Sequence, residues 1–285
     1  MDTEPSPRAP LTAGSLPALL RATHPGPSLA VTCFASVLAL SAGRGWGTPW
    51  VAGAVLAGQF SVGWANDWMD SGRDQRAGRR DKPIVAGLVG VGTVRRAALL
   101  ALAVSVPLSL ASGPRAASVH LLAVILGWAY NVKLKFTRWS VVPFAGAFAL
   151  LPMFVTLGLP AGHKGPWWAA VGGGLLGAGA HFTNVLPDLD DDAKTGVRGL
   201  PQRLGATPSL LIGATLLGLG VLVVCLAPEG PMGPARTASL VAGVACVATA
   251  VAAAMVGRTR LAFPCSMLAA GAVVAAFIDA GSNLA

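Results

Sequence analysis

The chain has 285 residues, of which 54% are hydrophobic and only 12% are charged, and its mean hydropathy is +0.64. Because an ordinary soluble domain is about 25% charged, this composition excludes that class and favours an integral membrane protein. The formal net charge of +9 would suit a nucleic-acid-binding protein. Basic membrane proteins carry the same excess in their cytoplasmic segments, so we expect the lipid bilayer as a partner and no nucleic acid.

The amino-terminal segment has acids and prolines before any apolar run. A cleavable signal peptide has the opposite order, with a basic start followed by an apolar stretch. We therefore interpret residues 1–15 as a disordered tail and residues 16–285 as a single membrane domain.

Apolar stretches then recur along the whole chain, each long enough for a helix that crosses a bilayer with about 20 residues. We count nine of them, at 27–43, 49–66, 97–112, 116–132, 139–162, 166–187, 206–228, 237–257 and 261–278. The sequence therefore predicts an all-α bundle of nine transmembrane helices.

The distribution of basic residues predicts the orientation of this bundle. If the amino terminus is cytoplasmic, the outer segments hold only four of the 21 Lys and Arg residues, namely Arg44, Arg115, Lys164 and Arg236. Such asymmetry follows the positive-inside rule. We expect a multi-pass protein of the plasma membrane whose active site faces the cytoplasm. The four histidines, His24, His120, His163 and His181, fall mostly at span ends and are interpreted as interfacial side chains.

Eight of the 12 acidic residues lie in two short windows, 67–81 and 188–192, both in expected cytoplasmic loops, 67–96 and 188–205. Each window fits the pattern N-x3-D-x3-D-x3-G. The paired positions are Asn66 with Asn184, Asp70 with Asp188, Asp74 with Asp192, and Gly78 with Gly196. Because the chain has only four asparagines, an internal repeat explains this match more simply than chance does.

The spacing of these residues indicates a metal site. In a helix, positions four residues apart lie on one face, so the carboxylates of each window would repel one another unless a cation lay between them. Oxygen ligands without Cys or His favour Mg2+, which is typically held by one or two carboxylates together with phosphate oxygens. Two such arrays predict a diphosphate clamped by Mg2+, although solvated loop acids remain the alternative. Pro187 is expected to break the helix just before Asp188.

The two windows resemble the motifs NDxxDxxxD and DxxxD of the UbiA superfamily of intramembrane prenyltransferases, which have nine transmembrane helices. Here the motifs read NDWMDSGRD at 66–74 and DLDDD at 188–192. Further segments resemble the basic stretches of that family, and they are 21–25, 81–87, 130–138 and 195–205. The resemblance covers nearly the whole chain.

This resemblance implies transfer of a prenyl group from a prenyl diphosphate to an acceptor, commonly an aromatic compound or quinone precursor, through an allylic carbocation. The implied Mg2+ ligands are Asn66, Asp70, Asp74, Asn184, Asp188 and Asp192. The implied diphosphate ligands are Arg21, Lys82, Tyr130, Lys135 and Arg138. The residues expected to be catalytic are Asp70, Asp74, Asp188, Asp192 and Lys135. Lys133 and Lys135 are two residues apart and cannot both face one site, and Lys135 is preferred because it is the lysine that matches the pattern of the family.

Two other functions stay open at this point. A membrane terpene cyclase would use the same ionisation without an acceptor, and the sequence hardly separates it from a transferase. A cation transporter is a more distant alternative, because it would place ionisable residues near the middle of the spans, whereas these acids gather at one membrane face.

Overall fold

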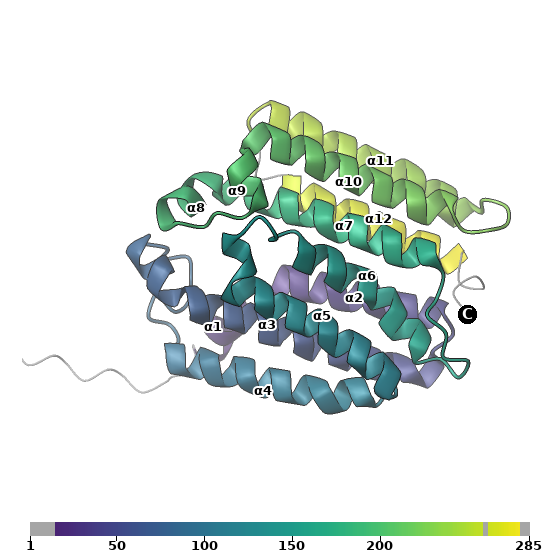
Figure 1. Cartoon of the computed structure of the whole chain (residues 1–285), viewed down its shortest axis with the longest axis horizontal. Helices are drawn as coiled ribbons and strands as arrows, with labels where there is room; N and C mark the ends of the chain where they lie inside the picture. The colour runs from purple at the N-terminus through teal and green to yellow at the C-terminus, as the bar shows by residue number, and fades with distance from the viewer. Residues whose placement is uncertain (1–14, 259–261, 280–285) are drawn as a thin grey trace, which may run out of the picture.

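The computed structural model describes residues 15–258 and 262–279, and within these ranges every regular element is a helix (Figure 1). The predicted tail, 1–15, lies outside them except for its last residue. The long helices are α2 (Pro25–Ser41), α3 (Thr48–Arg76), α4 (Val91–Leu110), α5 (Pro114–Val132), α6 (Val142–Leu157), α7 (Trp167–Val185), α10 (Ala206–Leu226), α11 (Pro234–Met255) and α12 (Ala262–Asp279). The short elements are α1 (Ser15–Arg21), η1 (Gly45–Gly47), η2 (Leu134–Phe136), η3 (Leu186–Asp188), α8 (Leu189–Thr195) and α9 (Leu200–Leu204).

The long helices run side by side, and α1, α8 and α9 gather at one end of the bundle (Figure 1). Helix α3 packs against α2, α4 and α5, while α7 packs against α6 and α10. Small residues allow the closest of these contacts. A Cβ added to Gly173 or Gly177 of α7 would lie 2.5 or 2.6 Å from a backbone oxygen of α6, so only glycine lets the two helices approach this closely.

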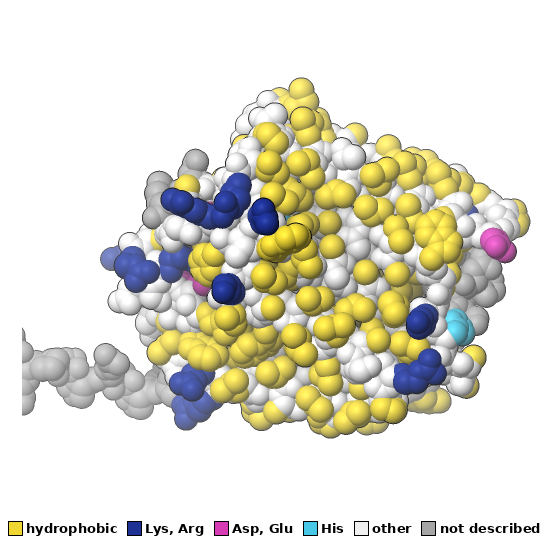
Figure 2. Space-filling view, viewed as in Figure 1, with side chains coloured by type: hydrophobic (Ala, Val, Ile, Leu, Met, Phe, Trp, Pro, Cys, Tyr) yellow, Lys and Arg dark blue, Asp and Glu magenta, His cyan; other side chains and the backbone are white. Residues whose placement is uncertain are grey.

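On the face shown in Figure 2, hydrophobic side chains form a broad band between the two ends of the molecule, where the Lys and Arg side chains gather. Among the described helices, α4, α10 and α11 are long and apolar enough to cross a membrane by themselves. Helices α2 and α6 are apolar but shorter. This band, which is too large for the surface of a soluble monomer, fits a surface solvated by lipid.

The prediction of long loops around the motifs is wrong in two places. Residues 67–76 continue α3, which ends only where Gly78 takes a positive φ of 68°, and α4 begins at Val91, so that the loop shrinks to 77–90. The charged residues after position 66 mark the end of the apolar stretch, but a helix does not have to end where its apolar stretch does. The second loop, 188–205, similarly contains α8 and α9.

The expected break at Pro187 is present. Helix α7 ends at Val185, and the chain passes through the single turn η3 before α8 begins at Leu189. A proline lacks the N–H that a continued helix would need. The two repeats of the sequence pattern therefore differ in structure, because the first lies on one continuous helix and the second crosses α7, η3 and α8.

Candidate active site

A cavity of about 540 Å3 lies at the end of the bundle where the short helices gather. Helix α3 and the 77–90 loop border one side of it, and α7, η3 and α8 border the other. Its lining is rich in charged and amide side chains, which include Arg21, Asn66, Asp70, Arg73, Asp74, Lys82, Tyr130, Lys135, Asn184, Asp188 and Asp192. All the predicted metal ligands, and all the predicted diphosphate ligands except Arg138, thus line one cavity.

The first motif lies on one face of α3. Asn66, Asp70 and Asp74 follow one another at intervals of about one helical turn, and both carboxylates are buried. Asp70 has two cationic partners, because Lys135 donates to one carboxylate oxygen and Arg73 donates to the other at 2.7 Å. Buried carboxylates are rare without such partners. The protein's own cations therefore hold Asp70 in place.

The amide of Asn66 links α3 to α5. Its Nδ2 donates to Asp70 Oδ2 at 3.2 Å and to Asn131 Oδ1 at 3.1 Å. Asn131 in turn donates to the backbone oxygen of Val62 at 2.9 Å. Both hydrogens of the Asn66 amide are thus engaged within the protein, so that its Oδ1 is the atom left to act as a metal ligand.

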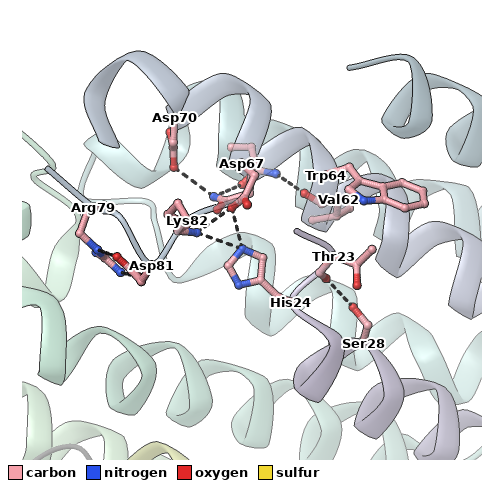
Figure 3. Close-up of polar contacts among 12 residues, drawn as sticks. Thr23, His24, Ser28, Val62, Trp64, Asp67, Asp70, Arg79, Asp81 and Lys82 are labelled. Carbon is pink, nitrogen blue, oxygen red and sulfur yellow. Dashed lines mark hydrogen bonds and ion pairs between the residues drawn. The ribbon is translucent and has the colours of Figure 1, made fainter. Parts of the chain in front are cut away.

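Asp67 is the centre of a second network in which His24 and Lys82 converge on one buried carboxylate (Figure 3). Lys82 Nζ donates to Asp67 Oδ1 at 2.6 Å, His24 Nε2 lies 3.1 Å from the same oxygen, and the two nitrogens are 3.3 Å apart. His24 has a φ of 54°, a strained value for a residue with a side chain. A Cβ added to Gly63 would lie 2.3 Å from the Thr23 oxygen, so the turn before α2 rests directly on α3.

Two of the four histidines, His120 and His181, do not lie at an interface as predicted. His24 belongs to the Asp67 network, and His120 and His181 are buried inside the bundle, with 4% and 1% of their surface exposed. Each buried ring contacts a serine hydroxyl, Ser109 at 2.7 Å for His120 and Ser140 at 3.0 Å for His181. Their sequence neighbours are apolar, and only the tertiary structure supplies these partners.

The second motif is more open to solvent than the first. Asn184 and Asp188 are exposed, and the Asp188 side chain retains 51% of its surface. Its nearest cation is Arg79 of the 77–90 loop, whose Nη1 lies 3.9 Å away. Asp192 accepts a hydrogen bond of 2.8 Å from Gln202 of α9. The 77–90 loop thus connects both motifs, through Lys82 to Asp67 and through Arg79 to Asp188.

Two of the carboxylates carry negative charge that the protein only partly offsets. Burial raises the pKa of Asp74, and the charges of Asp70 and Asp67 raise it further, against the opposing effects of nearby cations. Burial also raises the pKa of Asp192, although the Gln202 hydrogen bond acts in the opposite direction. A divalent cation between the motifs would stabilise both charged forms.

The segment after α5 contains three basic residues, Lys133, Lys135 and Arg138, which differ in burial. Lys135 is buried against Asp70, whereas Lys133 is exposed. This arrangement agrees with the preference for Lys135. Arg138 is exposed, and its guanidinium lies 5.4 Å from the centre of the Trp139 ring. Arg138 was expected to bind the diphosphate, but it is not among the residues that line the cavity. It follows the turn after η2, which places it outside the cavity.

The side chains of the cavity suit a metal site that a bound phosphate completes better than one formed by the protein alone. Within residues 15–258 and 262–279, no three His, Cys, Asp or Glu side chains lie close enough together to hold a metal ion alone. Mg2+, however, is usually bound by one or two carboxylates and completed by phosphate oxygens and water. The two motifs fit Mg2+ on this basis, with a diphosphate as the remaining ligand.

An apolar chamber of about 140 Å3 lies next to the polar cavity, between α3, α5 and α6. Tyr130 lines both spaces, and its ring meets Phe144 and His181 edge-on with ring centres 5.1 and 5.7 Å apart. A second apolar pocket of about 290 Å3 between α2, α6, α7 and α12 shares Val31 and Phe148 with the chamber. Polar cavity and apolar chamber therefore adjoin at Tyr130.

A model of the UbiA prenyltransferase family matches residues 28–263, which is most of the chain. The chain belongs to this family. The prediction of a UbiA-type prenyltransferase is thereby confirmed at the level of the family. Bacteriochlorophyll synthase 33 kDa chain from Cereibacter sphaeroides is 27% identical over 182 residues. That alignment covers 60% of each protein, so it spans less than two thirds of this relative.

Solved structures of UbiA proteins share the fold. A UbiA homologue from Aeropyrum pernix K1, solved in its apo form, has a TM-score of 0.73 at 19% identity, over 89% of this chain and 98% of its own. A UbiA homologue from Archaeoglobus fulgidus, solved with DMAPP and Mg2+, has a TM-score of 0.69 at 19% identity, over 94% and 98%. At such identities the similarity establishes the common fold alone.

Sequence reasoning missed several residues of this UbiA site, namely His24, Arg73, Asn131 and Gln202. Arg73 follows Asp70 by three residues, a helical spacing that brings the two side chains together and could have been recognised. His24 and Gln202 contact Asp67 and Asp192 from separate helices or turns. No spacing in the sequence indicates those two contacts.

Proposed function

We propose that this protein catalyses the Mg2+-dependent transfer of a prenyl group from a prenyl diphosphate to an acceptor, an aromatic compound or quinone precursor. The observation that carries this proposal is the pair of oxygen-ligand motifs lining one cavity that adjoins an apolar chamber at Tyr130. An amphiphilic donor matches this division, because its charged head would lie in the polar cavity while its hydrocarbon tail would extend past Tyr130 toward the larger apolar pocket between α2, α6, α7 and α12. The Archaeoglobus fulgidus homologue, which was solved with DMAPP and Mg2+, supports the same ligand class.

The proposed ligands of Mg2+ are the oxygen atoms of the two motifs, Asn66, Asp70 and Asp74 on α3 and Asn184, Asp188 and Asp192 on α7, η3 and α8. Bound Mg2+ would neutralise the negative charge that develops on the diphosphate as it leaves. The second motif is the more exposed, so it would be ordered mainly by the metal and the diphosphate.

The cations around the cavity complete the stabilisation of the leaving group. Lys135 and Arg73 already lie on the Asp70 carboxylate, and Lys82 lies on Asp67. These ammonium and guanidinium groups would also donate hydrogen bonds to the diphosphate oxygens, while Arg21 reaches the cavity from α1. Such pre-positioned donors lower the barrier most when they face charge that appears in the transition state.

Tyr130 marks the place where the allylic C–O bond would break. Its ring faces both the charged cavity and the apolar chamber, and Phe144 and His181 hold the ring edge-on. An aromatic face attracts a cation. The ring would therefore stabilise the carbocation while the surrounding apolar residues exclude water until the acceptor attacks.

We also propose that the nine long helices span the plasma membrane, with the amino terminus and the cavity on the cytoplasmic side. The charge distribution supports this orientation, because only Arg44, Arg115, Lys164 and Arg236 belong to the opposite side in that topology. Labelling of single-cysteine variants in intact cells and in inverted vesicles would test it. Labelling of the 77–90 loop from outside intact cells would contradict it.

The central test is product analysis with the purified full-length protein in lipid nanodiscs. Prenyl diphosphates of several lengths would be incubated with and without Mg2+ and with acceptors such as hydroquinone or naphthalene-1,4-diol. We expect Mg2+-dependent diphosphate release and a prenylated acceptor detected by mass spectrometry. A cyclic hydrocarbon formed without acceptor would instead indicate a terpene cyclase, and no diphosphate release from any donor would refute both reactions.

A further inference from the structure

The apolar chamber beneath Tyr130 contains two polar side chains that the reaction described above does not use. Its walls come from α3, α5 and α6 and are mainly aliphatic and aromatic, but Gln59 and His120 also line it. His120 precedes Tyr130 by ten positions on α5, which corresponds to about 15 Å along the helix axis. His120 therefore lies at the far end of the chamber from the polar cavity.

The hydrogen bonds of His120 define which of its ring nitrogens faces the chamber as an acceptor. The Ser109 hydroxyl donates to the Ser105 backbone oxygen at 2.5 Å, so its oxygen accepts from His120 Nδ1 at 2.7 Å. In a neutral imidazole whose Nδ1 carries the hydrogen, Nε2 has a free lone pair. Among the described residues, Nε2 has no hydrogen-bond partner. Stacking on Phe154, with ring centres 4.6 Å apart, fixes the plane of the ring.

Gln59 and Gly58 complete the polar end of the chamber. The Gln59 amide, which can donate and accept, has no hydrogen-bond partner within the part of the chain that the structure describes. Gly58 leaves the space beside the histidine free, because a Cβ there would lie 3.4 Å from His120 Nε2 and 2.9 Å from Val124. A purely hydrocarbon occupant would leave both polar groups unpaired in an apolar site, which is unfavourable.

We propose that this chamber is the acceptor subsite and that it recognises a single hydroxylated ring. The ring hydroxyl would donate to His120 Nε2 and accept from the Gln59 amide, while the opposite edge of the ring points toward Tyr130. Describing this occupant as the acceptor rests on the proposed prenyl transfer, but the hydroxyl recognition itself does not.

The size of the chamber supports a small occupant. A protein cavity of about 150 Å3 is known to bind benzene, and this chamber measures about 140 Å3. The neighbouring pocket of about 290 Å3 has no side chain with nitrogen or oxygen in its lining, so it suits hydrocarbon. The two spaces thus differ in the chemistry that they can satisfy, and only the chamber can pair with a hydroxyl group.

The test compares two probes of nearly the same shape, 4-fluorophenol and 4-fluorotoluene. Their binding to the full-length protein in nanodiscs would be followed by 19F NMR, with empty nanodiscs to subtract partition into lipid. We expect the phenol to bind at least about tenfold more tightly, because sites built around a hydroxyl reject analogues that lack it. His120→Phe and Gln59→Leu should each weaken phenol binding by about tenfold and toluene binding by less than about twofold.

A matched control and the opposite outcomes make this test decisive. Leu151→Met changes an apolar wall of the same chamber with little change in volume and should keep the preference for phenol. Equal binding of both probes to the unchanged protein, as expected if the polar groups hold only water, would overturn the proposal. So would a phenol preference that survives in both variants. Absence of diphosphate release together with an intact phenol preference would refute prenyl transfer and leave the hydroxyl site standing.

Discussion

The two motifs share a sequence pattern but differ in how the protein supports them. The first lies on an unbroken helix, and its Asp70 side chain, 8% exposed, is held by Lys135 and Arg73. The second crosses the break at Pro187, and its Asp188 side chain is 51% exposed, with Arg79 3.9 Å away. The first motif is therefore organised before any ligand arrives, whereas the second is left for the ligand to organise.

Asp70→Ala should have the largest effect and should affect folding as well as catalysis. Without its carboxylate partner, the buried Lys135 ammonium would lose its compensation, and breaking a buried ion pair typically costs about 3–5 kcal/mol. We expect diphosphate release to fall by on the order of 10³-fold and thermal unfolding in detergent to shift down by several degrees. A variant with normal unfolding would mean that Asp70 is not a structural anchor.

Asp188→Ala should separate catalysis from stability. Because Asp188 is half exposed and only loosely paired, we expect thermal unfolding to stay within about one degree of the unchanged protein. Diphosphate release should still fall by about 10²-fold or more, since the proposed reaction uses Asp188 as a metal ligand. Asp191→Ala, at an exposed neighbouring position, is the matched control and should remain within about twofold. Equal destabilisation by Asp70→Ala and Asp188→Ala would remove the contrast between the motifs.

Lys135→Met and Lys133→Met compare a buried lysine with an exposed one two residues away. Loss of the Lys135 ammonium removes a donor to Asp70 and, in the proposed reaction, a donor to the diphosphate, so we expect turnover to fall by about 10²-fold. Lys133→Met should change turnover by less than about twofold. Steady-state rates of diphosphate release would measure both, and similar losses in the two variants would count against the role given to Lys135.

The pH dependence of Mg2+ activation should show the smallest effect. Metal binding requires deprotonated carboxylates, and the raised pKa values of Asp74 and Asp192 let protons compete at higher pH than at an ordinary aspartate. As the pH falls, the Mg2+ concentration for half-maximal rate should therefore begin to rise at a higher pH than it would with ordinary aspartates. Gln202→Leu removes a hydrogen bond that lowers the Asp192 pKa and should steepen this rise. A rise that is no steeper in Gln202→Leu would exclude Asp192 as its source.

The sequence predicts the helical class, the break at Pro187 and most of the residues that line the cavity. Each of these depends on local spacing or composition, such as the four-residue intervals among Asn66, Asp70 and Asp74. The predicted loop boundary at residue 67 is wrong, because the end of an apolar stretch was interpreted as the end of a helix, although the four-residue spacing of the first motif itself indicates a helix. Nor does the sequence predict the direction of Arg138, which depends on the turn after η2.

The contacts that organise the site are mostly long-range and therefore hidden from sequence patterns. His24 meets Asp67 across 43 residues, and Asn131 meets Asn66 across 65. Such pairs depend on how the helices pack, and the packing depends in turn on glycines such as Gly63, whose role is visible only when Thr23 lies against it. Spacing along the chain finds the ligands of a site more readily than the residues that position them.

The length of α3 has a consequence for how an amphiphile would reach the site. Its 29 residues extend for about 44 Å, whereas the hydrocarbon core of a bilayer is about 30 Å thick. In the proposed orientation, the last turns of α3 extend beyond the hydrocarbon core. They place the carboxylates of Asp70 and Asp74 at the level of the lipid headgroups. A prenyl diphosphate dissolved in the same leaflet already has its phosphates at that height and its chain below. Capture would then need movement mainly within the plane of the membrane, so that the search is close to two-dimensional.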